Sequence, residues 1–527
     1  MDFAEKLKIY YQGKEESLKR SSFSSIDCFP DPFLQMRGYK EAIDFLNANR
    51  NEKMIVYGDY DVDGMTSTAI MVGMLKEKGI TTGYFIPSHY HDGYGLNEKY
   101  LASFKEKGYK VIITVDNGIV AFEAVKKARQ MGFKVMVVDH HDLQNEKLPE
   151  ADVIIHPEAS GYVPYNISAA FLTYLLSRGF LGRSDPYYAT LAGIAVFSDV
   201  EPLKEMNYTL AKFALDTLSQ HLYLQFDLLL GKKEGKVMTR DLNFQIISPL
   251  NSLARMDLGS NNNRGVRFLL SKDPSEISEL GNWILKVAGK KKERMKELRN
   301  LLNTVKEDDK PVEVDYFPGL EVGLIGVAAA GRADKIQKPV FVLTDSSLDP
   351  TLLNCSARSD NGSDIFSLCL GIRDYFLAFG GHKEALGFTI RRSDFPKVRD
   401  ALYKGSRNLK KEETRSKAIL LNKDEISLKN IELMESYEPF GNGFSEPLFA
   451  FILKKEETSY SRDGKHILVN FSESSGLTYF SYPSDLFKDK EEVLLLGRLR
   501  VNEFRSKKKA VFSSEKEEQE KKVELIG

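Results

Sequence analysis

The stretch Val56-Tyr57-Gly58-Asp59-Tyr60-Asp61-Val62-Asp63-Gly64 is the one around which the chain is organised. It continues an apolar run that starts at Met54, so the sequence predicts a buried strand that ends at the first aspartate. The aspartates alternate, and alternate residues of an extended segment share a face. Crowded carboxylates are unfavourable unless a cation joins them. Taken alone, the stretch is as consistent with a turn that caps a helix from Thr66 onward as with a divalent-metal site.

Three further apolar runs are followed by acids or histidines. The runs and the side chains after them are Val111–Val115 with Asp116, Val135–Val138 with Asp139, His140 and His141, and Leu191–Val196 with Asp199. Open α/β sheets place their binding sites at the carboxyl ends of strands. If all these runs are strands, their ligand-type side chains converge, which favours one shared metal site over a set of unrelated turns.

In this order, the four stretches resemble the motifs of the DHH phosphoesterase superfamily and, within it, of the RecJ-type single-strand exonucleases. The similarity runs from about Asp31 to about Phe504, nearly the whole chain. The resemblance implies two bound Mn²⁺ or Mg²⁺ ions, bridged by Asp116. The ligands it implies are Asp61, Asp63, Asp116, His140 and Asp199. It also implies that His141 acts on the scissile phosphate or the leaving oxygen, while Asp59 and Asp139 fix the ligands.

The composition is that of a globular protein, with 527 residues, 42% of them hydrophobic and 28% charged. The sequence has no apolar run long enough to span a membrane, and its start lacks the pattern of a secretory signal. Cys28, Cys355 and Cys369 form no metal-ligand spacing. We therefore expect a cytoplasmic protein. A formal net charge of −1 gives no reason by itself to propose a nucleic-acid ligand.

Apolar runs alternate with helical segments from Met54 to about Leu203, which predicts a mostly parallel sheet. The predicted fold class is α/β multidomain. The predicted parts are a DHH catalytic domain with an N-terminal lead-in over 1–270, a connecting helix over 271–310, a DHHA1 α/β domain over 311–405, an OB-like β-barrel over 406–515 and a charged tail over 516–527. The nearly all-charged residues 514–524 are expected to be disordered. Asp273 is expected to cap the connecting helix, with Glu276 completing a capping box.

Several other residues match segments that bind substrate in the family. They are Asn251, Arg255, Ser356, Arg358, Gly380, Gly381 and His382. The two glycines are expected to form a backbone nest for an anion, beside an arginine that can grip a phosphate. On the residues alone, a buried arginine and a plain turn are serious alternatives. Departures from the family pattern are His89 in place of a loop arginine, Leu320-Glu321 in place of Trp-His, and Arg332 displaced by one position.

Short strands from Ile467 onward predict a small barrel, which the family uses as a platform for single strands. Cations mix there with an aromatic residue, a pattern that fits backbone tracking and stacking, or else a solvated edge strand. These residues are Arg498, Arg500, Phe504, Arg505 and Lys507–Lys509.

The resemblance implies metal-dependent hydrolysis of phosphodiester bonds in single-stranded DNA, from 5′ to 3′, in DNA repair and recombination. It further implies a monomer away from membranes, with a single-strand-binding protein and a helicase as partners. One alternative is a phosphodiesterase for short oligonucleotides or cyclic dinucleotides, which the long connector and the barrel argue against. The other is a non-catalytic scaffold associated with replication, which the presence of every motif ligand argues against.

Overall fold

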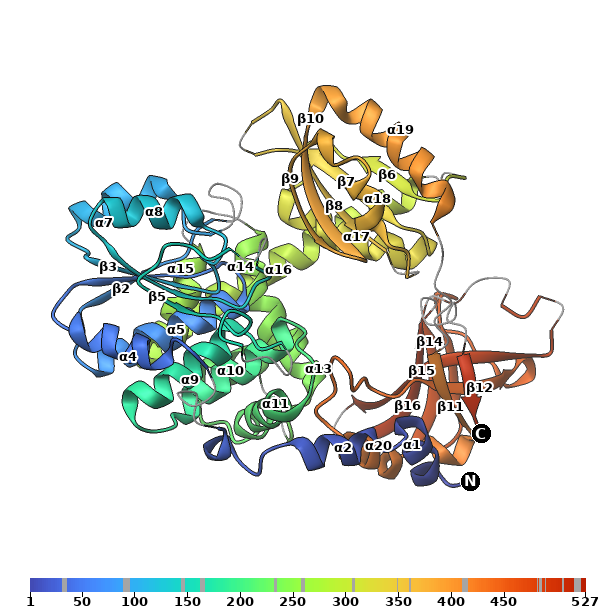
Figure 1. Cartoon of the computed structure of the whole chain (residues 1–527). Coiled ribbons are helices and arrows are strands. Elements are labelled where there is room, and N and C mark those ends of the chain that lie inside the picture. Colours follow the sequence, from blue (N-terminus) through green and yellow to red (C-terminus); the bar gives the residue numbers. More distant parts are fainter. Residues whose placement is uncertain are drawn as a thin grey trace.

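The structure is a computed structural model, and it describes the chain apart from residues 31–35, 89–94, 144–146, 162–165, 232–234, 257–260, 306–308, 348, 360–361, 410–415, 481, 483–485, 489, 505–506 and 516–522. His89, Arg505 and most of the predicted tail therefore lie outside the described residues. Figure 1 shows three lobes: an N-terminal α/β lobe, a second α/β lobe above it, and a C-terminal β lobe.

The first lobe is built on a parallel sheet with the strand order β2-β1-β3-β4-β5. The strands are β1 (Met54–Tyr57), β2 (Thr82–Phe85), β3 (Val111–Val115), β4 (Lys134–Val138) and β5 (Val153–Ile155). Alternate residues of β1 enter different cores: Met54 and Val56 pack on one face, Ile55 and Tyr57 on the other. Both faces are thus covered by helices, as Figure 1 shows, which explains the continuous apolar runs.

The helices of this lobe are α2 (Lys14–Ser21), α4 (Tyr39–Ala48), α5 (Val62–Glu77), α7 (Leu101–Glu106), α8 (Phe122–Gln130), α9 (Ala169–Leu181), α10 (Pro186–Ser198), α11 (Glu205–Leu218), α12 (Leu224–Leu230), α13 (Thr239–Asp241), the π-helix η3 (Leu242–Ile247), α14 (Ser248–Arg255) and α15 (Asn261–Leu270). The strand predicted over Leu191–Val196 is wrong, because these residues lie in α10. Asp185 caps this helix and Pro186 opens it, and burial on all sides removes the periodicity that would mark a helix.

One long helix, α16 (Pro274–Thr304), leads from the first lobe to the second, within the range predicted for the connector. The side chain of Asp273 caps it by accepting a hydrogen bond of 2.9 Å from the Ser275 amide. The predicted capping box is wrong. Glu276 accepts hydrogen bonds from Arg267 and Ser271 instead, and the amide of Asp273 donates to Ser271 Oγ at 3.3 Å.

The second lobe has a mixed sheet in the order β6-β7-β8-β10-β9, with only β6 and β7 parallel. Its elements are β6 (Glu313–Tyr316), α17 (Val322–Ile336), β7 (Val340–Asp345), β8 (Leu352–Arg358), α18 (Ile365–Leu370), β9 (Phe376–His382), β10 (Ala385–Arg391) and α19 (Phe395–Gly405). Helix α17 packs with the end of α16 on one face of the sheet, and α18 and α19 cover the other.

The C-terminal lobe has a sheet in the order β13-β14-β16-β15-β12-β11-β17. Its elements are β11 (Ser416–Leu421), α20 (Leu428–Glu435), β12 (Phe449–Lys454), β13 (Ile467–Asn470), β14 (Ser475–Phe480), β15 (Glu492–Phe504), β16 (Lys507–Glu515) and β17 (Val523–Ile526). The expected disorder over 514–524 is wrong at both of its described ends. Ser514 and Glu515 belong to β16, and Val523 and Glu524 belong to β17, whose backbone hydrogen bonds are satisfied by pairing with β11.

The first helix, α1 (Phe3–Tyr11), packs on the C-terminal lobe, so it does not belong to the predicted unit 1–270. The ammonium of Lys6 lies 2.9 Å from the carboxylate of Glu425, and both side chains are buried. The ring of Tyr11 stacks on that of Phe444 with centroids 4.5 Å apart. The first helix and the last strand therefore meet in one lobe, as the labelled termini in Figure 1 show.

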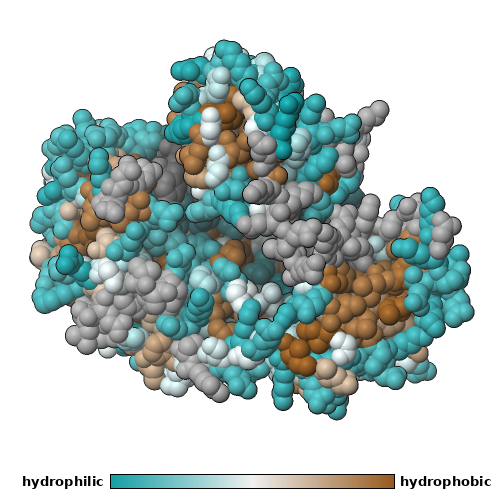
Figure 2. Space-filling model, turned by 45° about the vertical axis from the view of Figure 1, so that its right-hand side comes forward, coloured by the Kyte–Doolittle hydropathy of each residue, from teal (hydrophilic) through white to brown (hydrophobic). Residues whose placement is uncertain are grey.

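The outer face of the C-terminal sheet carries an apolar area, visible at the lower right of Figure 2. Its exposed side chains include Ile452 and Leu494, which are partners across β12 and β15, and Leu525 of β17.

Candidate metal centre

The carboxyl ends of β1, β3 and β4 meet at one edge of the first sheet. The chain order reverses between β1 and β3, and such a switch point is where open α/β sheets form binding crevices. Asp59 lies in the segment after β1, Asp116 follows β3, and His140 lies just after β4. Asp199 joins them from the C-terminal end of α10. The predicted ligands are thus brought together, the last of them by a helix.

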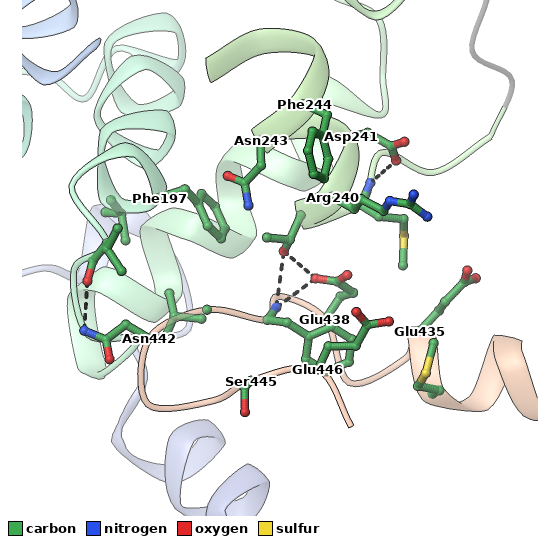
Figure 3. A pocket seen from close by; sticks show the side chains of 18 of the residues that line it. Phe197, Arg240, Asp241, Asn243, Phe244, Glu435, Glu438, Asn442, Ser445 and Glu446 are labelled. Carbon is green, nitrogen blue, oxygen red and sulfur yellow. Dashed lines mark hydrogen bonds between the residues drawn. The ribbon is translucent and has the colours of Figure 1, made fainter. Parts of the chain in front are cut away.

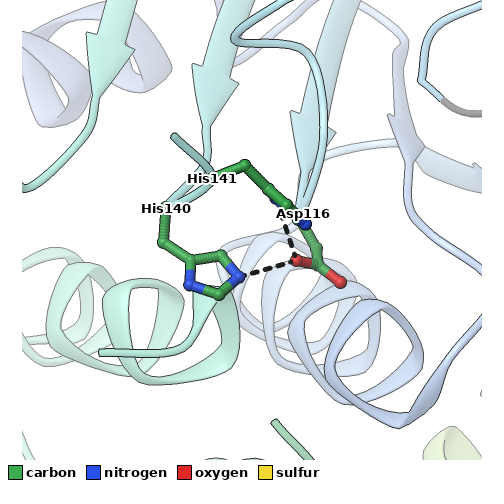
Figure 4. A group of neighbouring side chains, drawn as sticks. All are labelled: Asp116, His140 and His141. Carbon is green, nitrogen blue, oxygen red and sulfur yellow. Dashed lines mark ion pairs between the residues drawn. The ribbon is translucent and has the colours of Figure 1, made fainter. Parts of the chain in front are cut away.

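The ring of His140 lies at the centre of this cluster. Its Nε2 atom is 3.2 Å from Asp116 Oδ1, 3.3 Å from Asp199 Oδ2 and 3.6 Å from Asp63 Oδ2. Figure 4 shows the ring pointing at Asp116 from the neighbouring strand end. An imidazole nitrogen facing three carboxylates is a donor set for a divalent cation.

Three overlapping groups of side chains could each hold a metal ion, with their donor atoms within 4.8 Å of one another. The groups are Asp59 with Asp61 and Asp116, Asp63 with His140 and Asp199, and Asp116 with His140 and His141. Asp116 and His140 each belong to two of them.

Backbone hydrogen bonds fix two of the carboxylates. Asp63 accepts from the amides of Ala169 and Ala170, at 2.7 and 2.8 Å, at the start of α9. Asp139 accepts from the Ile119 amide at 2.9 Å and lies 2.8 Å from Nδ1 of His141. Asp139 therefore orients a neighbouring histidine, while Asp59 lies among the candidate ligands themselves.

Burial and mutual repulsion make the negative charge of this cluster unfavourable. Burial, followed by the neighbouring carboxylates, raises the pKa values of Asp116 and Asp199 well above the usual range. The same causes raise the pKa of Asp63 to about 7. Burial and the charge of His141 lower the pKa of His140 to about 4, so this imidazole is neutral at pH 7. Its contacts with the carboxylates are therefore not salt bridges.

The residues present fit a divalent cation. Asp59 Oδ1 and His140 Nε2 are buried atoms without a hydrogen-bond partner. Buried polar atoms are normally satisfied, and cations held by the donor groups of Asp59 and of His140 would satisfy these atoms while offsetting the repulsion between the acids. Oxygen donors with one imidazole suit Mn²⁺ and Mg²⁺.

Glu201 is a member of the cluster that sequence reasoning missed. Its side chain is buried, and Oε1 lies 3.6 Å from Nδ1 of His140. Burial and the charge of Asp63 raise the pKa of Glu201 to about 8. A second acid two residues after Asp199 was the available signal.

Comparison with known proteins shows which proteins this chain is similar to. A sequence model of the DHH family, N-terminal domain, matches residues 53–196, and one of the RecJ OB domain matches residues 419–515. The single-stranded-DNA-specific exonuclease RecJ of Bacillus subtilis is 28% identical over 505 residues, which cover 91% of this chain and 63% of that protein. RecJ of Haemophilus influenzae is 28% identical over 517 residues, 89% of either chain.

The chain is similar to RecJ-type proteins, and its residues 53–196 match the DHH family.

Among solved structures, RecJ of Thermus thermophilus in complex with Mn²⁺ superposes with a TM-score of 0.81 at 22% identity, covering 97% of this chain and 75% of that one. This likeness confirms the predicted fold class. The chain spans less than two thirds of the Bacillus subtilis relative's length. In the described part of the chain, no helix is both long and apolar enough to cross a membrane.

The RecJ-type segment with Asn251 and Arg255 lies on α14, next to the metal centre. Asn251 Oδ1 accepts a hydrogen bond of 3.2 Å from the Val62 amide, at the start of α5. Burial, followed by the charge of Arg255, lowers the pKa of Lys291 on α16 to about 8. Arg255 of α14 and Lys291 of α16 are therefore close enough for their charges to interact.

The phosphate site predicted from Ser356, Arg358, Gly380, Gly381 and His382 falls on adjacent strands of the second lobe. Arg358 Nη1 donates to the carbonyl of Ala357 at 2.8 Å and to Ser356 Oγ at 3.2 Å. His382 is opposite Ala385, which is also the partner of Arg358, so these side chains share one end of the sheet. The predicted anion nest is wrong, because both glycines lie in the extended strand β9 and pair with β10.

Arg332, which stands one position from the RecJ-type pattern, has a structural role. It is buried, its Nη2 lies 2.6 Å from Glu313 Oε1, and its Nη1 donates to the carbonyl of Leu302 at 3.2 Å. Glu321 is bound by Arg294 of α16 at 2.9 Å. Both departures from the family therefore serve the junction between α16 and α17.

The two arginines predicted to bind nucleic acid on β15 are already engaged within the lobe. Arg498 donates to the carbonyl of Glu446 at 2.6 Å, and Arg500 pairs with the carboxylate of the same residue. Lys507 and Lys508 on β16 are exposed. β15 and β16 lie inside the sheet, so the alternative of an edge strand is wrong, while nucleic-acid binding by this lobe stays a prediction.

Proposed function

We propose that the chain is a metal-dependent exonuclease that hydrolyses phosphodiester bonds in single-stranded DNA from the 5′ end. The observation that carries the proposal is the convergence of Asp63, Asp116, His140 and Asp199 on one point. The curated relatives named above are single-stranded-DNA-specific exonucleases, which supports the substrate.

Two divalent ions, Mn²⁺ or Mg²⁺, are the proposed cofactors, because the donor groups overlap at Asp116 and His140. Asp61, Asp63, Asp116, His140 and Asp199 would hold them, with Asp59 beside them. When bound, such ions neutralise phosphate charge and make water a stronger nucleophile at neutral pH. Solved RecJ structures in complex with Mn²⁺ and with Mg²⁺ support this choice.

His141 is the group we propose for handling a proton. Although burial lowers it, the hydrogen bond and charge of Asp139 raise the pKa of His141 to about 9. The ring is therefore protonated at pH 7, with Nδ1 directed at Asp139 Oδ1, 2.8 Å away. We propose Nε2 as the atom that contacts a phosphate oxygen or donates a proton to the leaving oxygen.

Ser356, Arg358 and His382 are proposed to bind the 5′-terminal phosphate from the second lobe, and Asn251 and Arg255 to contact the strand near the metals. A guanidinium is a strong phosphate ligand, and a contact at a fixed distance from the metal centre would set the polarity. We further propose a monomer in the cytoplasm that acts with a single-strand-binding protein and a helicase.

Hydrolysis of single strands labelled at either end tests the function. With Mn²⁺, a 5′ label is expected in mononucleotides from the first time point, whereas a 3′ label stays on progressively shorter strands. Hydrolysis of short oligonucleotides or cyclic dinucleotides alone would favour the small-substrate phosphodiesterase. Absence of all hydrolysis would favour a non-catalytic scaffold.

The phosphate pocket has its own test in the ratio of initial rates on 5′-phosphate and 5′-hydroxyl strands. Arg358→Ala should remove most of the preference for 5′-phosphate, because a bidentate donor is lost. Arg391→Ala is the matched control, since this exposed arginine lies at the opposite end of the same strand pair. An unchanged ratio in Arg358→Ala would mean that the phosphate binds elsewhere.

A further inference from the structure

The turn after α10 carries two acids of the metal centre in a strained conformation. Asp199 and Glu201 both face the ring of His140, at 3.3 and 3.6 Å. Between them, Val200 has a φ of +54°. A β-branched residue rarely adopts this left-handed region, and such a conformation persists only where the surroundings hold it.

The α10 side of the turn is held by its own helix. The amides of Asp199 and Glu201 donate to carbonyls of Ala195 and Val196, at 3.0 and 2.9 Å. The carbonyl of Val200 is held from elsewhere: it accepts a hydrogen bond of 2.8 Å from Nδ2 of Asn442, shown at the left of Figure 3. The turn thus has one fixed side within α10 and one that depends on the C-terminal lobe.

Asn442 also contacts the same turn through its backbone. Its carbonyl accepts a hydrogen bond of 2.9 Å from the amide of Leu203. A Cβ atom on the neighbouring Gly441 would come within 2.9 Å of a Leu203 methyl group, so the contact is close. One residue, 242 positions away in sequence from Val200, therefore holds both the middle and the end of the turn.

The loop that presents Asn442 is itself fixed. Gly441 and Phe444 exchange backbone hydrogen bonds of 2.8 and 3.0 Å, which leaves Asn442 at the tip of a tight turn. At the base of the loop, Glu438 accepts hydrogen bonds from Thr239 Oγ1 at 2.5 Å and from the Phe440 amide at 2.8 Å, as Figure 3 shows. The asparagine is thus a preorganised donor whose position is set by both lobes.

We propose that Asn442 is a positioning residue for the metal centre: it holds Val200 in its left-handed conformation, so that Asp199 and Glu201 face His140. Docking of the C-terminal lobe thereby completes the metal site in the N-terminal lobe. The inference rests on the proposed metal centre, and it adds that metal affinity depends on a residue of the C-terminal lobe.

The test is Mn²⁺ affinity, measured by calorimetry on the metal-free chain of 527 residues. Asn442→Ala is expected to weaken binding about 10–100-fold, the usual loss when a group that orients a metal ligand is removed. Asn442→Asp, which replaces the donor while keeping the shape, should do the same. Asn430→Ala is the matched control, because this asparagine donates a similar bond of 2.9 Å to the Glu425 carbonyl within the C-terminal lobe.

A rescue experiment separates positioning from simple attachment of the lobes. Glycine adopts a positive φ without strain, so Val200→Gly in the Asn442→Ala background should restore affinity to within about threefold of Val200→Gly alone. Failure of this rescue, unchanged affinity in Asn442→Ala and Asn442→Asp, or an equal loss in Asn430→Ala would overturn the inference.

Hydrolysis of single strands is recorded separately. A wild-type protein that binds Mn²⁺ without hydrolysing DNA would refute the proposed function and leave the positioning result standing.

Discussion

At the scale of single residues, Asp116 shows how backbone conformation dictates the choice of a substitution. Its φ is +62°, a region that asparagine tolerates and alanine does not favour. Asp116→Asn therefore removes the charge with little change of backbone. We expect it to lower hydrolysis more than about 100-fold, because both candidate donor groups that contain Asp116 lose a carboxylate.

The same substitution should stabilise the metal-free protein. Burial raises the pKa of Asp116, so its charged form destabilises the folded state at neutral pH, and each pKa unit corresponds to about 1.4 kcal/mol. Initial rates on single strands measure the loss of hydrolysis. Urea unfolding with and without Mn²⁺ measures the stability and its dependence on the ion, with Asp44→Asn on the surface of α4 as the control. Undiminished stabilisation by Mn²⁺ in Asp116→Asn would contradict the role of this residue.

The raised pKa of Glu438, at the junction of the lobes, predicts how the stability of the protein depends on pH. Burial raises its pKa from 4.5 to about 7 in the folded protein. A raised carboxyl pKa contributes stability below the unfolded value, and that contribution is lost as the pH rises from about 4.5 to about 7. Glu438→Gln should thus gain up to about 3 kcal/mol relative to wild type between pH 4.5 and pH 8. The measurement is the difference in urea midpoint between Glu438→Gln and wild type. If this difference is the same at pH 4.5 and at pH 8, the carboxyl is not buried as described.

At the scale of elements, the junction of α16 with α17 depends on one buried ion pair. Arg332→Met would leave Glu313 buried and unpaired, which typically costs about 3–5 kcal/mol of folding free energy. Replacing both residues, as Arg332→Met with Glu313→Leu, should recover most of the loss. Urea unfolding measures the stability, and the affinity of the folded variant for single strands should stay unchanged. A weaker affinity at unchanged stability would restore a role in nucleic-acid binding to Arg332.

At the scale of the whole molecule, the two ends of the chain stabilise the same lobe. Lys6→Met removes the partner of the buried Glu425 and should cost about 3–5 kcal/mol, whereas Lys8→Met, on the exposed side of α1, should cost less than about 0.5 kcal/mol. Urea unfolding followed by the exchange of backbone amides would locate the loss in the C-terminal lobe. Faster exchange confined to the first sheet would contradict the packing of α1.

The sequence by itself determined the elements whose signal is local. The buried strands that precede Asp116 and His140 are recognisable in the sequence as short apolar runs. The start of α16 is recognisable from Asp273 and Pro274. These features depend on the residues nearest in the chain, since caps, periodicity and strand ends act over a few positions. The order of the motifs was enough to predict the similarity to RecJ-type proteins.

The tertiary structure decided what depends on distant partners. Burial on all sides made α10 read as a strand, and only its packing shows that Asp199 is delivered by a helix. Glu201 belongs to no motif, and it joins the cluster because the turn at Val200 is folded toward His140. Asn442 holds that turn from the other end of the chain. Local periodicity in a sequence shows which residues will be buried. Which distant elements pack against them is decided only when the lobes dock.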